Sequence, residues 1–303
     1  MQPRRRAEIQ IVAAALLFSI GGAAIKACAL TAWQVASFRS GIAAAVILLL
    51  VPAARRGWSR RTVLVGLAYA ATVILFVLAN KMTTAANAIF LQSTAPLYIL
   101  LLGPWLLREQ IQRREILIMT LVAVGLGMFF LGIQSPQKTA PDPLRGNILA
   151  ALGGVSWTLT IVGLRWLGRA EDPKSKIRSL TQARKGPQSS ESTIAAVALG
   201  NLIAFAVALP WALPVGESRT KDWVLVGLLG VFQIGLAYVF LTRGIGHITA
   251  LEASLLLLIE PVLNPIWALL IHGEKPGGWA LVGGLLILGA TVLKSASGKL
   301  ASD

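Results

Sequence analysis

Apolar windows of about 20 residues recur along the whole chain and are separated by short polar connections. At a rise of about 1.5 Å per residue, a helix of that length crosses the hydrocarbon core of a bilayer. The pattern therefore predicts an all-α integral membrane protein with ten transmembrane helices, at residues 9–29, 33–52, 62–80, 85–107, 114–133, 146–168, 192–212, 222–243, 249–271 and 277–295. The one long connection, 169–191, is polar and basic, and we expect it to form an exposed loop.

Composition supports the membrane class and narrows the partners. Only 14 % of the residues are charged, whereas soluble domains carry about 25 %. The net charge of +15 comes from basic residues in the connections, a distribution typical of a membrane protein, so we expect a lipid bilayer and no nucleic acid as partner. Cys28 is the only cysteine, which excludes an internal disulfide and a multi-cysteine metal site.

The distribution of Lys and Arg predicts the orientation. Of the 28 basic residues, 20 lie on the side of the N-terminus, 7 lie on the opposite side and Arg39 lies within the second segment. Basic loops stay in the cytoplasm. We therefore expect a multi-pass protein of the bacterial inner membrane with both termini and the 169–191 loop in the cytoplasm.

The two halves of the chain share features in the same order, namely VLVGL at 63–67 and 224–228, Pro96 with Pro261, and Glu109 with Glu274. Each half contains five predicted helices, an odd number, so the second half must be inverted relative to the first. Inverted repeats are typical of secondary transporters, whose sites lie near mid-membrane between the repeats. We expect one repeat at 1–135 and the second at 145–296.

Three segments carry a resemblance to a known family: SFRSGIAAAVILLL (37–50), TAPLYILLLGPWLLREQ (94–110) and IEPVLNPIWALLIHGEK (259–275). With them the chain resembles drug/metabolite transporters of the EamA type, and among these most of all the YddG amino-acid exporters. The resemblance implies a basket in which helices one to four and six to nine surround a central cavity. Helices five and ten would then lie outside it.

The ninth predicted helix contains an unusual group of residues. Glu260 lies at its centre, about 15 Å from either surface, where an ionisable side chain must face protein or water. Pro261 and Pro265 release backbone carbonyls there, and we expect them, with Pro96 in the other half, to kink or gate the helices. A protonated packing role for Glu260 remains an alternative.

Other predicted helices carry short polar stripes at helical spacing, and the resemblance places these helices around the cavity. Together with Glu260 and Asn264, the candidate substrate-cavity residues are Ser19, Tyr69, Thr72, Phe76, Asn80, Asn87, Thr94, Tyr98, Ser156, Trp157, Thr160, Gln233 and Phe240. We expect Arg39 to brace the outer end of the basket, with snorkelling to the headgroups as the alternative.

Glycines are frequent in the fifth and tenth helices, at Gly125, Gly127, Gly132, Gly283, Gly284 and Gly289. Small residues let helices approach closely in lipid, so we expect each of these helices to pack on its own half. A monomer is expected, and dimerisation through these helices is the alternative.

No motif for an enzyme, a cofactor or a metal site is present, since the sequence contains neither GxxxxGK[ST] nor HExxH. A cavity with one carboxylate, amides, hydroxyls and aromatic rings suits a small neutral or zwitterionic solute. We expect an exporter of amino acids or similar small metabolites that works by alternating access and facilitated diffusion. Two alternatives stay open: proton-coupled efflux of cationic drugs through Glu260, and a membrane scaffold or receptor that transports nothing.

Overall fold

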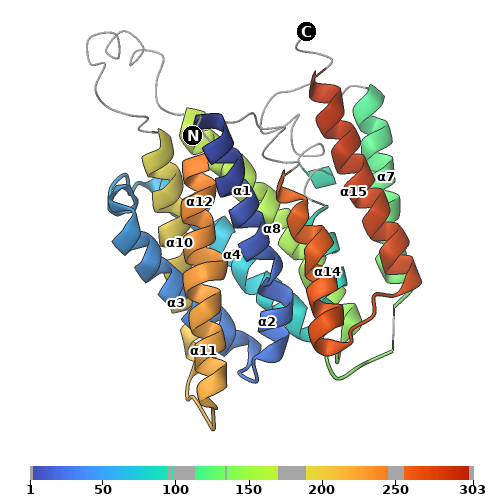
Figure 1. Cartoon of the computed structure of the whole chain (residues 1–303), viewed down its shortest axis with the longest axis horizontal. Coiled ribbons are helices and arrows are strands. Elements are labelled where there is room, and N and C mark those ends of the chain that lie inside the picture. The colour runs from blue at the N-terminus through green and yellow to red at the C-terminus, as the bar shows by residue number, and fades with distance from the viewer. Residues whose placement is uncertain are drawn as a thin grey trace.

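The computed structural model describes residues 3–94, 97–98, 113–133, 135–169, 189–244 and 256–299. Apart from short turns, these residues form helices that run side by side in one bundle (Figure 1). Six helical stretches are long and apolar enough to span a membrane: Arg4–Ala27, Ala32–Leu50, Arg60–Met82, Pro143–Leu164, Glu191–Ala212 and Thr220–Gly244. Shorter apolar helices lie at Ile116–Leu131 and Gly278–Leu293.

The first half contains α1 (Pro3–Ser19), α2 (Gly21–Ala27), α3 (Ala32–Leu50), the 3-10 turn η1 (Pro52–Arg55), α4 (Arg60–Met82), α5 (Ala85–Gln92) and α7 (Arg113–Leu131). Polar side chains fix where several of these helices begin. Thr31 accepts a hydrogen bond from the backbone of Gln34, whose side chain bonds back to Thr31, and Ser59 accepts from Thr62 in the same way. Such caps satisfy the free N–H groups of a first turn.

The second half contains α8 (Pro143–Arg169), α10 (Ser189–Ala212), α11 (Thr220–Leu228), η2 (Leu229–Leu236), α12 (Ala237–Gly244), α14 (Ile259–His272) and α15 (Gly278–Lys299). The η2 segment is a π-helix, so the span from Thr220 to Gly244 has a wider turn at its middle. Gly273 ends α14 in the left-handed conformation, with φ of 65°. Glycine takes that conformation without a side-chain clash.

The predicted helices agree with these elements where the structure describes them. The fourth and ninth segments are described only in part, by α5 and α14, and the 169–191 loop lies largely outside the described residues. The count of ten spans and the two repeats therefore stay predictions.

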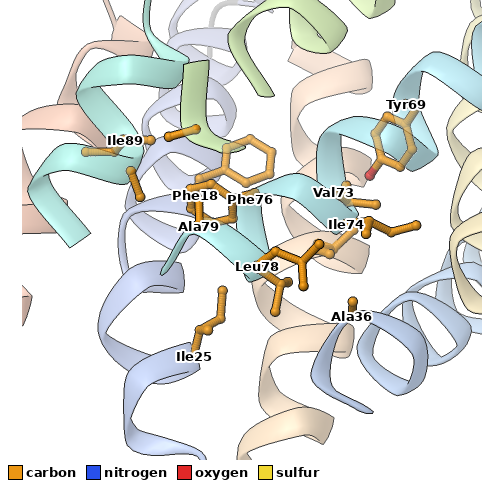
Figure 2. Packing of buried hydrophobic residues seen from close by; sticks show 14 of the residues in the cluster. Phe18, Ile25, Ala36, Tyr69, Val73, Ile74, Phe76, Leu78, Ala79 and Ile89 are labelled. Carbon is orange, nitrogen blue, oxygen red and sulfur yellow. The ribbon is translucent and has the colours of Figure 1, made fainter. Parts of the chain in front are cut away.

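Helix α4 lies at the centre of the bundle, since 67 % of its span is buried, against 39–50 % for the other five spans. It packs against α8 and α10, and α10 also packs against α3. Its side chains Tyr69, Val73 and Phe76 belong to the same hydrophobic core as Phe18 of α1 (Figure 2). The outer surface carries large exposed apolar side chains, Leu49, Leu131, Leu270 and Leu285 among them, as expected for contact with lipid.

Helices α7 and α15 stand together at the edge of the bundle (Figure 1). Gly125 of α7 lies against Gly283 of α15. A Cβ added to either glycine would lie only 2.6–2.8 Å from the carbonyl oxygen of the other. Each helix thus has the other as its main partner, and the expectation that each packs on its own half was wrong. Glycines at one crossing let the two backbones approach, a contact that no pattern within either helix reveals.

Candidate functional site

A cavity of about 400 Å³ lies inside the bundle, beside α4. Residues from α1, α3, α4, α5, α8, η2, α12, α14 and α15 line it, and most of its wall is apolar or aromatic. The polar or aromatic lining residues are Phe18, Arg39, Tyr69, Thr72, Phe76, Gln92, Ser93, Trp157, Gln233, Tyr238, Glu260 and Thr291. We call it the central cavity.

Arg39 is the basic residue in this wall. Its side chain is 1 % exposed, and its guanidinium donates from Nη1 to Gln233 Oε1 at 3.2 Å and from Nη2 to the Val73 carbonyl at 2.9 Å. The guanidinium carbon also lies 6.0 Å from the centre of the Phe76 ring. Arg39 therefore points into the protein, and snorkelling is excluded. Arg39 lies in the wall of the central cavity, whereas we had expected it to brace the outer end of the basket.

Glu260 is the acidic residue in the same wall. It lies in the first turn of α14, half-buried, and forms no hydrogen bond or ion pair with any residue that the structure describes. Pro261 is buried next to it and lines the cavity, and Pro265 is buried within α14. Pro96, the expected counterpart in the first half, lies outside the described residues.

Aromatic rings form much of the remaining wall. Tyr238 packs edge-on against Tyr69 and Phe18, with ring centres 5.5 and 5.1 Å apart. Tyr69 is 1 % exposed, and its hydroxyl accepts a hydrogen bond of 3.0 Å from Asn201. Trp157 of α8 also lines the cavity, so these rings leave an apolar space with few polar groups.

The π-helix explains one difference from the predicted wall. Helical spacing grouped Gln233 with Phe240, yet Gln233 and Tyr238 line the cavity and Phe240 does not. A π-turn holds an extra residue, so residues five apart come to one face. The prediction assumed a regular α-helix through this span.

Three other residues predicted for the cavity, Ser156, Thr160 and Ser19, are absent from its wall. The hydroxyls of Ser156 and Thr160 lie 3.1 and 3.3 Å from the Thr72 hydroxyl, and Thr72 itself lines the cavity. Ser19 is buried and accepts a hydrogen bond from Trp267 Nε1 at 3.0 Å.

The fourth predicted helix contributes less to the cavity than expected. The Thr94 hydroxyl donates to the Leu91 carbonyl, and Tyr98 is half-buried, near the position where Gly154 would carry a Cβ. Neither residue lines the central cavity.

Asn80 and Asn264 both approach Gly22, and neither lines the central cavity. Both are fully buried, and both approach Gly22 so closely that an added Cβ would lie 3.0 Å from Asn80 Oδ1 and 2.4 Å from Asn264 Oδ1. Asn264 has no partner for either amide atom in the part of the chain described, and Asn80 Oδ1 also lacks one. Glycine at position 22 is what lets the two amides approach.

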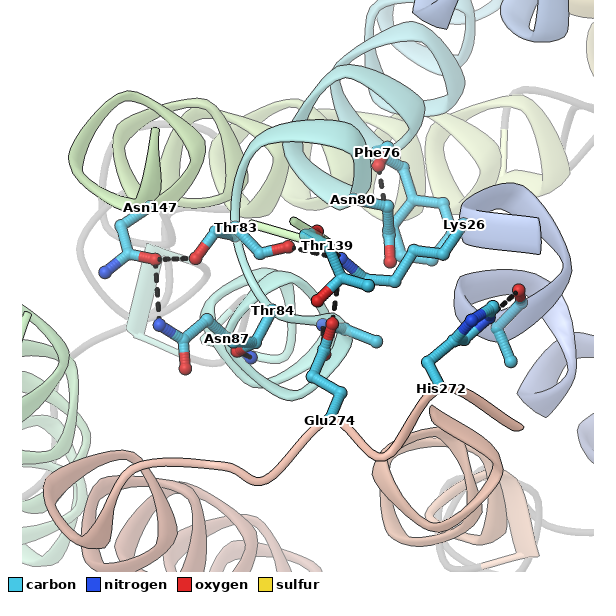
Figure 3. Close-up of polar contacts among 12 residues, drawn as sticks. Lys26, Phe76, Asn80, Thr83, Thr84, Asn87, Thr139, Asn147, His272 and Glu274 are labelled. Atoms are coloured by element: carbon cyan, nitrogen blue, oxygen red, sulfur yellow. Dashed lines mark hydrogen bonds and ion pairs between the residues drawn. The ribbon is translucent and has the colours of Figure 1, made fainter. Parts of the chain in front are cut away.

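Beyond these asparagines lies the distal end, meaning the end of the bundle away from the first residues of α1. It comprises residues 27–32, 82–85, 135–143, 213–220 and 273–278. A buried ion pair holds it together, with Lys26 Nζ 3.1 Å from Glu274 Oε2 and both side chains at most 2 % exposed (Figure 3). Lys26 also donates to the carbonyls of Thr83, at 2.7 Å, and Thr139.

The turn after α14 directs Glu274 into this position. The Glu274 N–H bonds back to the Ala268 carbonyl across Gly273, so the chain reverses there. Glu274 Oε1 then accepts from the backbone N–H of Ala85 at the start of α5, a helix end that favours a carboxylate.

Asn87 belongs to this distal network and not to the central cavity. Asn147 Oδ1 accepts from Asn87 Nδ2 at 3.0 Å and from the Thr83 hydroxyl at 2.7 Å (Figure 3). Asn147 Nδ2 donates to the Phe129 carbonyl. Among the residues described, no group of three or more potential metal ligands occurs.

Sequence reasoning missed Tyr238 and Asn201, the Lys26–Glu274 pair, and the position of Arg39 within the cavity wall. A signal existed for Lys26, since a lysine in an apolar helix of a membrane protein needs a partner. Glu274 was noted only as the match of Glu109.

Comparison with known proteins agrees with this architecture. Two curated relatives, the pseudopaline exporters CntI of Pseudomonas aeruginosa strains UCBPP-PA14 and PAO1, are 26 % identical over 295 residues, covering 95 % of this chain and of each relative. A solved crystal structure covering 99 % of this chain has the same fold, with a TM-score of 0.61 at 20 % identity.

The model of the EamA-like transporter family matches residues 5–131 and 179–296, most of both halves. The chain is therefore a multi-pass membrane transporter and not an enzyme, and it belongs to the EamA-like transporter family.

Proposed function

We propose that this transporter exports amino acids or similar zwitterionic metabolites across the bacterial inner membrane, by alternating access and facilitated diffusion. One observation carries the proposal: among the residues described, the central cavity holds one guanidinium, Arg39, and one carboxylate, Glu260, in a mostly apolar wall. An α-amino acid carries the two complementary charges.

The two charged residues have different roles in this proposal. Arg39 is held by Gln233 and Val73, and its Nε has no partner among the described atoms, so a donor remains for a substrate carboxylate. Glu260 has no basic partner there and would accept a substrate ammonium group. Tyr69, Tyr238 and Trp157 would pack on the side chain.

The cavity argues against the cationic-drug alternative. A cation that reached Glu260 would share the cavity with the buried positive charge of Arg39, and like charges repel strongly at low dielectric. Membership of a transporter family argues against a scaffold. The curated relatives, named as exporters of pseudopaline, support export as the direction of transport.

Purified protein in liposomes loaded with radiolabelled amino acids tests the proposal. We expect saturable efflux without a pH gradient, and we expect Glu260→Gln to weaken transport of amino acids while sparing carboxylic acids that lack an amino group. Glu217→Gln, at an exposed carboxylate between α10 and α11, is the matched control and should behave as wild type. Efflux of cationic dyes but not of amino acids would contradict the proposal. Amino-acid efflux that occurs only when a pH gradient is applied would also contradict it.

The proposed orientation, with the distal end in the periplasm, has a separate test. In a Cys28→Ser background, we expect Lys138→Cys to react with a membrane-impermeant maleimide in intact cells. Leu180→Cys should react only after the cells are opened. The opposite result reverses the topology.

A further inference from the structure

A second cavity, of about 580 Å³, lies at the distal end, separate from the central one. We call it the distal cavity. Four lysines line it, Lys26, Lys81, Lys138 and Lys221, together with His272, Asn80 and Thr139. Among the lining residues that the structure describes, none is acidic. The described lining of the central cavity, by contrast, contains one basic and one acidic residue.

The two acidic groups beside Lys26 and Lys81, Glu274 and Asp222, are already held by other groups. Glu274 binds Lys26 and the N–H of Ala85. Asp222 is 3 % exposed, and its carboxylate accepts from the backbone N–H groups of Ala29, at 2.6 Å, and Arg219. Each carboxylate thus lies beside one of these two lysines, Glu274 beside Lys26 and Asp222 close enough to Lys81 for attraction, so the excess positive charge of the distal cavity comes from Lys138 and Lys221.

The four lysines fall into two kinds. Lys26 is paired, and Lys81 donates to the Cys28 carbonyl while lying close enough to Lys26 for the two charges to repel. Lys138 and Lys221 are exposed and form no hydrogen bond or ion pair with the described chain. Two exposed cations and two fixed ones thus line one cavity, an arrangement suited to a small anion.

Asn80 adds a neutral acceptor to the same cavity. Its Nδ2 donates to the Phe76 carbonyl at 2.9 Å, whereas its Oδ1 is buried without a partner (Figure 3). A buried oxygen without a donor costs free energy that a ligand with an N–H or O–H group would recover. The cavity therefore combines cations for a carboxylate with one acceptor for a donor group on the same ligand.

We propose that the distal cavity is a binding site for small carboxylate ions that also carry a hydroxyl or amino group, such as hydroxy acids and amino acids. Lys138 and Lys221 hold the carboxylate, and Asn80 Oδ1 accepts from the donor. This site is additional to the central cavity, and its occupancy does not depend on the direction of transport or on transport itself.

Equilibrium binding of radiolabelled malate to the purified protein in nanodiscs tests the proposal. Succinate is the matched ligand, because it has the same two carboxylates and lacks the hydroxyl. We expect saturable malate binding that weakens as salt rises, with succinate binding several-fold more weakly at equal ionic strength. Lys138→Gln combined with Lys221→Gln should lower malate affinity at least tenfold, and both side chains are exposed, so this variant should fold.

Two control variants test whether malate binds in the distal cavity. Lys275→Gln removes an exposed lysine of the same end that does not line the cavity, and malate affinity should stay at the wild-type value. Asn80→Ala should abolish the preference for malate over succinate while keeping binding of both.

Unchanged malate affinity in the double lysine variant would overturn the proposal, as would equal affinity for malate and succinate in the wild type. Because the measurement is binding to purified protein, loss of amino-acid efflux in liposomes would refute the proposed export and leave this result standing.

Discussion

The two cavities hold their charged side chains in different ways. In the central cavity Arg39 is fixed by Gln233 and Val73 in a surrounding of rings, and Glu260 has no described partner. In the distal cavity two lysines are tied down and two are exposed to solvent. Buried charges act at low dielectric and are insensitive to salt, whereas exposed charges are screened. Under our two proposals, substrate selection belongs to the central cavity and binding of small anions to the distal one.

The largest effect on stability is expected at the base of the distal cavity. Lys26→Met leaves the Glu274 carboxylate buried without its cation, which typically costs about 3–5 kcal/mol. Thermal unfolding in detergent should show a lower Tm. Combining Lys26→Met with Glu274→Leu removes both charges and should recover a large part of the loss. An unchanged Tm in Lys26→Met would show that the ion pair does not stabilise the distal end.

In the central cavity the largest effect is expected on transport. Arg39→Gln removes the guanidinium that we assign to the substrate carboxylate, and hydrogen bonds to charged groups are worth about 1.5–3 kcal/mol, so efflux at low substrate should fall about 10- to 150-fold. The efflux rate of Arg39→Lys should lie between those of the wild type and Arg39→Gln, because lysine keeps the positive charge and loses the fork geometry of the guanidinium. Initial rates from liposomes measure both variants, and wild-type rates in Arg39→Gln would remove this residue from the site.

A third substitution lies outside both cavities. Gly284→Leu drives a side chain into the Phe90 ring, which lies 2.7 Å from an added Cβ, and overpacking of this kind costs about 1–3 kcal/mol. Gly289→Leu is the control, since no described atom lies within 4 Å of its Cβ position. The Tm should fall only in Gly284→Leu, with substrate affinity unchanged in both. A change in affinity without a change in Tm would instead place the part of α15 around Gly284 at the site.

The smallest effect is expected where α1 meets α14. Trp267→Phe loses the hydrogen bond from Nε1 to the Ser19 hydroxyl, a contact worth about 1 kcal/mol. Ser19→Ala and the double variant complete a mutant cycle by thermal unfolding. A coupling energy near zero would show that the bond does not join the two helices.

The sequence predicted the helices because each span is a local property of about 20 neighbouring residues. It also identified Tyr69, Thr72, Phe76, Trp157, Gln233 and Glu260, which all line the central cavity. It did not place Arg39 there, because that position depends on Gln233, 194 residues away. The Lys26–Glu274 pair was missed for the same reason, since their pairing depends on how distant helices meet.

The π-helical segment Leu229–Leu236 has a consequence for how this span tolerates length changes. The π-turn absorbs one extra residue, so deletion of one residue between Gln233 and Tyr238 would restore regular α-helical bonding and leave the two side chains four positions apart, still on one face. Insertion of one further residue at the same place, without a further bulge, would instead turn everything after it by about 100° around the helix axis. Tyr238 would then move away from Tyr69 and Phe18, so this side of the wall tolerates the loss of one residue better than the gain of one.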